Sequence, residues 1–453
     1  MPKMGNIGVA NASAFGFASA TIGKGYFIAI AGNTGGSVIT PNTVKVDSLG
    51  YIYANDGGDS FVLKITPTGS LVYAKKLNVT SIVFTLWSMD LDTSGNIYVA
   101  GQYTSTNGGY YKFDNSCATI LASSSISLTS SYARCIAVDN SGNIFVSGNY
   151  VAGSSPTSRV FIVKYNSSGS ITSQLGLKAL STTYGTAIPQ NCIINKTTGD
   201  LYMVARMTNT NSQNIYVHNK INSSLTSLNS LGLIFLSTTS TAYGGQVGGI
   251  DYDSSGNIYM TGTTTTATST DRYTWVAKYN STMATQTWIK IYRGTTGFVQ
   301  NQFTQVRVDR TTDEIYVMGY VRADATNYNK GYIAKYNTSG TVLWNRFFYA
   351  TTAGNYTVWD ITFDGDAYIL CGQTAITNVP MVIARLPKDG SKTGTYTVGG
   401  ASIVYENNTP LTGTRTMSQE IYTTDVISST ATSINSPTVT NWSPGVNAST
   451  VIT

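Results

Sequence analysis

The phrase Asp-x-Ser-Gly-Asn-Ile-Tyr recurs along this chain, and its recurrence restricts the possible folds more than any other feature. Three copies are complete or nearly so, and four are weaker. Self-similarity at spacings of 45 to 58 residues is typical of an array of supersecondary units, none of which buries its apolar face alone. The seven copies begin at Asp47, Asp92, Asp139, Asn195, Asp253, Asp309 and Asp364.

Each repeat predicts four short β-strands. A short apolar run such as residues 136–138 precedes the repeated Asp, whose side chain and following Gly favour a tight turn. The second strand follows as Ile-Tyr-Val or a close variant, the third reads as at 161–165, and a second Gly-bearing turn leads to the fourth. Seven such units predict an all-β, seven-bladed β-propeller of four-stranded antiparallel blades. A β-helix would show a shorter period without this four-strand order.

Composition at the two ends sets the expected domain organisation. Residues 1–40 are rich in Gly, Ala and Ser and form an N-terminal arm for docking or ring closure. Residues 41–400 form the propeller, and the Thr/Ser-rich residues 401–453 form a C-terminal extension. Residues 25–31 or 395–398 could complete the seventh blade. We expect the arms to dock on neighbours, so that deletion of residues 1–35 leaves a soluble propeller.

The repeated Asp and a repeated cation belong to one end of each blade. A calcium loop needs several oxygen ligands, whereas each of these turns offers one carboxylate, so a turn-forming role is favoured. The first and third strands run in the same direction, which places the Asp turn near a cation of the third strand. We predict that the two pair as a seam, weakened where Asn195 replaces Asp. The cations are Lys64, Lys112, Lys164, Lys220, Lys278, Lys335 and Arg385.

The loops at the opposite end of the blades vary in length and composition, which is how a scaffold presents a binding surface. For any single residue there, an ordinary surface position is the simpler interpretation. The 31 tyrosines suit polar recognition of glycans or proteins by this face as a whole. The candidate binding residues are Tyr103, Tyr150, Arg206, Arg272, Tyr273, Arg322 and Tyr328.

Little else in the sequence indicates chemistry. The one histidine, His218, has no acidic or thiol neighbour in sequence and is interpreted as a plain strand residue. The four cysteines lack metal-like spacing; Cys135 and Cys192 could approach each other, but buried free thiols are favoured. Charged residues make up only 11% of the chain and its cations are spread evenly. We therefore predict no enzyme, cofactor, metal site or nucleic-acid partner.

The repeat Asp-x-Ser-Gly-Asn-Ile-Tyr-x-x-Gly with Val-Ala-Lys-Tyr-Asn-x-x-Gly resembles the SBBP (seven-bladed β-propeller) repeat family over residues 43–390. That family is defined by its fold and implies no single function. The last repeat departs from it at residues 386–396, and this ending resembles propeller proteins in the virions of tailed phages.

The second resemblance implies a structural or adhesive subunit of a phage virion, associated with the tail. Its partners would be other virion proteins bound through the terminal arms, together with a host-surface glycan or receptor, in an oligomeric assembly. The absence of a convincing signal peptide and of a long apolar segment fits assembly in the host cytoplasm without membrane insertion. The alternative is a bacterial cell-surface or secreted propeller that binds glycans.

Overall fold

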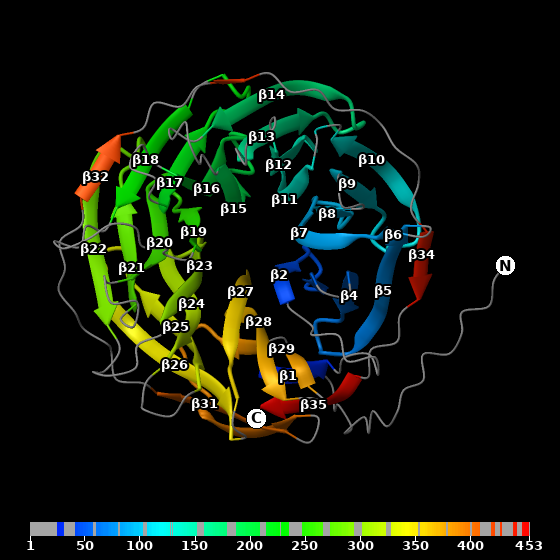
Figure 1. The fold of residues 1–453 in the computed structure, drawn as a ribbon. Coiled ribbons are helices and arrows are strands. Elements are labelled where there is room, and N and C mark those ends of the chain that lie inside the picture. The colour runs from blue at the N-terminus through cyan, green and yellow to red at the C-terminus, as the bar shows by residue number, and fades with distance from the viewer. Residues whose placement is uncertain are drawn as a thin grey trace.

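The computed structural model is an all-β ring of seven blades around a central channel (Figure 1). It contains no helix among the described residues, and hence none that could cross a membrane. It describes residues 25–30 and 41–452 except for 58–59, 80–81, 103–106, 127, 129, 152–157, 179–186, 209–213, 227, 235–246, 266–271, 294–300, 323–327, 352–353, 377–378, 399–400, 408–417, 422–425, 428–437 and 442–445.

Each blade is a twisted antiparallel sheet whose first strand lies at the channel and whose fourth lies at the rim, as predicted. Blade 1 is β2 (Pro41–Val46), β3 (Ile52–Asp56), β4 (Phe61–Ile65) and β5 (Leu71–Val79), with β6 (Ile82–Val83) beside β5. Blade 2 is β7 (Thr85–Leu91), β8 (Ile97–Gln102), β9 (Gly108–Phe113) and β10 (Ile120–Ile126). Blade 3 is β11 (Tyr132–Val138), β12 (Ile144–Val151), β13 (Ser158–Tyr165) and β14 (Ile171–Lys178).

The remaining blades follow the same order. Blade 4 is β15 (Ala187–Ile194), β16 (Leu201–Thr208), β17 (Asn214–Ile221) and β18 (Leu228–Ile234). Blade 5 is β19 (Val247–Tyr252), β20 (Ile258–Thr265), β21 (Arg272–Tyr279) and β22 (Gln286–Arg293). Blade 6 is β23 (Gln302–Asp309), β24 (Glu314–Val321), β25 (Lys330–Tyr336) and β26 (Val342–Ala350). Blade 7 is β27 (Thr357–Asp364), β28 (Ala367–Ile376), β29 (Val379–Pro387) and β1 (Gly25–Ile30).

The hydrophobic core lies between neighbouring blades. One cluster joins Tyr98 and Tyr110 of blade 2 to Ile136, Phe161 and Tyr165 of blade 3, all of them buried. The aromatic residue of every second strand is likewise buried, with at most 1% of its surface exposed. Since each cluster draws on two blades, no blade is stable alone and the array must close into a ring.

The N-terminal strand closes the ring. β1 pairs antiparallel with β29, and Tyr26 lies opposite Arg385. Residues 395–398, the other candidate for this role, lie in β30 (Gly394–Val398), which forms a hairpin with β31 (Ala401–Asn407) on the rim of blade 6. Residues 25–30 therefore belong to the propeller, and deletion of residues 1–35 would remove the fourth strand of blade 7.

The C-terminal extension runs round the outside of the ring and adds a fifth strand to five blades (Figure 1). β31 pairs with β26, and β32 (Ser418–Ile421) pairs with β18. β33 (Val426–Ile427) pairs with β14, β34 (Thr438–Asn441) with β5, and β35 (Val446–Ile452) with β1. The described strands of this extension thus cover the rim edges of the chain's own blades, which we call the rim belt.

Candidate functional site

The repeated phrase builds a turn in which one carboxylate organises the whole motif. In blade 2, Asp92 Oδ1 accepts hydrogen bonds from the backbone N–H of Ser94 and of Asn96, both at 2.9 Å. Its Oδ2 accepts hydrogen bonds from Asn96 Nδ2 at 2.8 Å and from the Tyr98 hydroxyl at 3.0 Å. Gly95 has a φ of 75°, which an L side chain rarely adopts. The carboxylate is occupied by donors of its own turn, as the turn-forming interpretation requires.

The predicted pairing of the repeated Asp with the third-strand cation occurs in several blades. Ion pairs join Lys112 to Asp92 at 3.9 Å, Lys278 to Asp253 at 3.6 Å, and Arg385 to Asp364 at 2.8 Å. In blade 4, where Asn195 replaces the Asp, Lys220 pairs instead with Asp200 at 3.8 Å. In blade 6, Lys335 pairs with Glu314 at 2.6 Å, and Asp309 pairs with Lys388.

Five of these cations also join their blade to the next, through a backbone contact that the sequence did not reveal. Their ammonium groups each donate a hydrogen bond to a backbone carbonyl in the second turn of the following blade and lie beside the buried aromatic ring of their own blade. We call this set of contacts the cation seam. Its bonds run from Lys64 to Asn115 (3.3 Å), Lys164 to Ser223 (2.8 Å), Lys220 to Ser281 (3.1 Å), Lys278 to Thr338 (3.5 Å) and Lys335 to Lys388 (3.0 Å).

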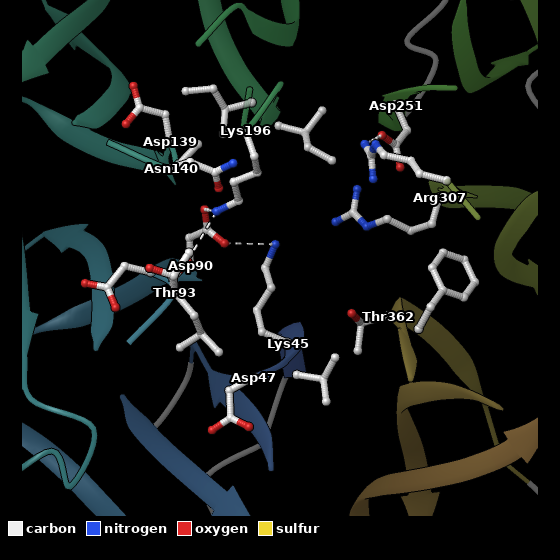
Figure 2. A pocket seen from close by; sticks show the side chains of 18 of the residues that line it. Lys45, Asp47, Asp90, Thr93, Asp139, Asn140, Lys196, Asp251, Arg307 and Thr362 are labelled. Atoms are coloured by element: carbon white, nitrogen blue, oxygen red, sulfur yellow. Dashed lines mark hydrogen bonds and ion pairs between the residues drawn. The ribbon is translucent and has the colours of Figure 1, made fainter. Parts of the chain in front are cut away.

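The channel contains two hollows, one toward the Asp turns and one toward the variable loops. The turn-end hollow, of about 500 Å³, is lined by residues of all seven innermost strands. Figure 2 shows the Lys45 and Lys196 ammonium groups converging on Asp90, at 3.5 and 2.8 Å. On the opposite wall Asp251 pairs with Arg310.

These buried carboxylates hold neighbouring blades together. Asp90 accepts the backbone N–H of Val138 in the next blade at 2.9 Å, Asp251 accepts that of Val308 at 2.9 Å, and Asp360 accepts that of Val44 at 3.3 Å. An innermost strand has a free edge, and its N–H groups need partners once they are buried. Burial alone would raise the pKa of Asp90, but Lys196, Lys45 and the Val138 N–H hold it at about 2. We call these contacts the carboxylate staples.

The loop-end hollow, of about 480 Å³, has different walls. Every innermost strand carries a β-bulge five residues before the repeated position, where the residue is left out of the pairing with the second strand. All of these residues except a glycine line the hollow. The seven, which we call the bulge ring, are Asn42, Trp87, Arg134, Gln190, Gly248, Thr304 and Trp359.

The bulge ring combines a fixed backbone with a different residue in each blade, apart from its two tryptophans. The positions that maintain the fold keep their residue type from repeat to repeat, as the Asp turn and the cation seam do. Sequence reasoning missed the bulge ring, although an alignment of the seven repeats would show the divergence at this position. That pattern is typical of a scaffold carrying one asymmetric binding site.

The residues predicted for the loop face occupy different environments in the structure. Arg206, on β16, lines the loop-end hollow. Tyr150 is buried, 8% exposed, in the cluster between blades 2 and 3, so it is a packing residue and not a surface one. Tyr328 is 44% exposed, and the Arg322 Nε donates to Asn329 Oδ1 at 3.3 Å.

Three further candidates are described only in part or not at all. Arg272 and Tyr273 lie on β21, paired with β20, and Tyr103 lies outside the described residues. Among the described residues, no cluster of three or more His, Cys, Asp or Glu could hold a metal ion.

His218 and the cysteines lie in the interior. Burial lowers the pKa of His218 to about 3, and its ring lies edge-on to Trp275, with neither ring nitrogen hydrogen-bonded to a described residue. All four cysteines are free thiols. The Cys192 thiol contacts Cys135 on the neighbouring innermost strand, and this contact and burial raise its pKa.

The solved structures that this chain resembles are distant from it in sequence. No protein-family model and no curated protein matches the chain, so membership in the SBBP repeat family is not shown. A Staphylococcus aureus virginiamycin B lyase structure is 11% identical over 80% of this chain and 99% of its own, with a TM-score of 0.45. A Penicillium chrysogenum α-L-arabinanase is 10% identical over 69% and 98%, with a TM-score of 0.43. The extracellular domains 1–2 of Drosophila Semaphorin 1a are 10% identical over 79% and 87%, also with 0.43.

The prediction that the chain is not an enzyme is wrong, because a propeller architecture does not exclude catalysis. Propeller enzymes, a lyase and an arabinanase among them, are among the solved structures that it matches. The low charged content and the lack of an obvious acid–base set therefore gave no ground for excluding catalysis. Identities of 10 to 12% transfer no activity to this chain.

Proposed function

We propose that this protein is a binding propeller that takes a polar ligand of the glycan class in the loop-end hollow. The observation that carries the proposal is the bulge ring, in which corresponding β-bulges of seven blades carry mostly different residues, six of them on the wall of one cavity. Its two tryptophans, on blades 2 and 7, offer apolar faces for sugar rings, and its amides offer both donors and acceptors.

The walls of the hollow suit a sugar better than an apolar ligand. Amide side chains are the commonest polar groups on it, so hydroxyl groups would find partners on several sides. Trp359 Nε1 donates to Gln373 Oε1 at 3.2 Å, which fixes the ring at the channel wall. The amides that line the hollow are Asn42, Gln190, Asn191, Gln302 and Gln305.

A glycan array probed with the labelled protein tests this proposal. We expect the wild type to bind a defined set of glycans, and the Trp87→Ala/Trp359→Ala variant to lose at least about tenfold in affinity, as aromatic contacts at a binding site usually cost. Trp288→Phe, on the outer strand β22, is the matched control and should bind normally. Absence of binding to any glycan, or unchanged binding by the double variant, would overturn the proposal.

The setting in a phage particle is a separate proposal, supported by the resemblance of residues 386–396 and the tail after them to virion propellers. Neither the comparisons nor the described contacts bear on it, and the rim belt binds the chain's own blades. Mass spectrometry of density-purified particles tests it. A small fixed copy number relative to the major capsid protein would support a virion subunit, whereas recovery from cell envelope or medium would support the surface-propeller alternative.

A further inference from the structure

Two arginines lie at the loop-end hollow without a carboxylate partner among the described residues. Arg134 is the bulge-ring residue of β11, and Arg206 comes from β16 of the next blade. The described residues that line this hollow include no Asp or Glu, and no ion pair joins either arginine to a described carboxylate. By contrast, Lys45 and Arg307, which also line this hollow, pair with Asp90 and Asp360.

The geometry holds these two guanidinium groups toward the same space. Arg134 Nε donates to Asn149 Oδ1 at 2.7 Å, and its guanidinium carbon lies 4.7 Å from the ring centroid of Trp87. Burial lowers the pKa of Arg134, and the neighbouring charge of Arg206 lowers it further. Like charges brought together in a partly buried site are unfavourable unless an anion joins them.

Two buried donors at the same place also lack a partner. Arg206 Nε and Trp87 Nε1 are shielded from solvent and make no hydrogen bond to any described residue. A buried donor left unsatisfied costs about 1–3 kcal/mol, so such groups in native proteins generally meet water or a ligand. Their common requirement is an acceptor, and the adjacent positive charges favour an anionic one.

We propose that the ligand of this hollow is a carboxylate-bearing sugar, an inference that rests on the proposed glycan-binding function. Its carboxylate lies between Arg134 and Arg206 and accepts hydrogen bonds from the Arg206 Nε–H and from the Arg134 guanidinium. The sugar ring lies against the indole of Trp87, and its hydroxyl groups bond to the amides of Asn42 and Gln190. Planar guanidinium groups match a carboxylate better than ammonium groups do.

Calorimetric titration of the full chain tests the charge of the ligand. The probes are oligogalacturonate, oligomannuronate and sialyllactose, each beside its neutral methyl ester, and a sulfated galactan oligosaccharide. We expect at least one acid form to bind about tenfold to a hundredfold more tightly than its ester, as hydrogen bonds to charged groups usually give. Arg134→Gln and Arg206→Gln should each remove that preference, while Lys290→Gln on outer strand β22 should keep it.

The outcomes separate this inference from the proposed function. Equal binding of acid and ester, or a preference untouched by both arginine variants, would overturn the carboxylate site. Glycan binding that still depends on Trp87 and Trp359 would leave the hollow as a site for neutral sugars. Preference for the sulfated oligosaccharide alone would assign the anion to sulfate and overturn the carboxylate. The acid-to-ester comparison on wild-type protein needs no variant, so a poorly folded substitution does not spoil the test.

Discussion

At the scale of single residues, the fold depends on polar groups that are buried but fully occupied. Asp92 saturates its two carboxylate oxygens with donors of its own turn, and each seam cation bridges two blades. His218 differs from these groups, because its ring is buried and neither nitrogen bonds to a described residue. Only the neutral imidazole is compatible with that environment.

The state of His218 predicts an acid-dependent loss of stability. Its folded pKa of about 3 lies below the unfolded value of about 6.5, so the unfolded chain binds the extra proton. Its contribution is therefore fully present above pH 6.5 and is lost progressively as the pH falls toward 3. Between pH 7.5 and 5, His218→Phe should gain about 2 kcal/mol in unfolding free energy relative to wild type. Urea unfolding of both proteins at both pH values measures this difference. An equal change in unfolding free energy for wild type and His218→Phe would contradict the prediction.

At the scale of elements, neighbouring blades are joined at the channel by the carboxylate staples and farther out by the cation seam. Both devices satisfy backbone groups at blade edges that four-stranded sheets leave free. Each carboxylate staple places a charged group in the interior. The stabilisation that it contributes therefore depends on the cations beside it.

Replacement of Asp90 tests the staple. Its folded pKa of about 2 lies below the unfolded value of about 3.9, so its stabilisation is present above pH 3.9 and is lost as the pH falls to 2. Asp90→Asn leaves Lys196 and Lys45 without their partner and should lower the unfolding free energy at pH 7 by about 2–3 kcal/mol. The unfolding free energy of Asp90→Asn should also change less than that of wild type between pH 4 and 2. Asp366→Asn, at an exposed turn, is the control and should change neither the stability at pH 7 nor its dependence on pH. If Asp90→Asn is as stable as wild type at pH 7, Asp90 does not stabilise the contact between the blades.

The strands could be predicted from sequence because the repeat encodes them locally. Turn, aromatic and cation recur in the same order in every repeat, and the structure places the aromatic opposite the cation, as at Tyr98 and Lys112. The bulge at Trp87 and the staple from Asp90 to Val138 could not be predicted from the repeated phrase, since the first is an irregularity in the pairing of β7 with β8 and the second is a contact between two blades. Tyr150 is predicted as a surface residue because Gly148 marks the expected end of the second strand, whereas β12 runs three residues beyond Gly148 and packs Tyr150 between two blades.

At the scale of the whole molecule, the two ends of the chain hold the ring closed. β1 lies between β29 and β35, so the N-terminal strand is covered by the last strand of the rim belt. The sequence did not decide which segment closes the ring, because residues 25–30 share no motif with the repeats. The Thr/Ser-rich tail has no apolar period of its own, and its strands are defined by the edges that they cover.

Removal of the closing strand tests this closure. A chain lacking residues 1–31 loses β1, leaves β35 and the outer edge of β29 without a partner strand, and loses the buried Tyr26 side chain, which contributes about 3–5 kcal/mol by itself. It should aggregate or melt well below full length, as followed by circular dichroism and gel filtration. A chain lacking only residues 1–23 keeps β1 and serves as the control. Melting of both truncations at the same temperature would show that another segment closes the ring.

The central claim is that the asymmetric ring of bulge residues forms the ligand site of an otherwise repetitive propeller. A crystal structure of the protein with the acidic oligosaccharide that it binds most tightly tests this claim most directly. We predict sugar density in the loop-end hollow, with its carboxylate between Arg134 and Arg206 and its ring against Trp87. Density on the outer surface, with only water in the hollow, would contradict the account.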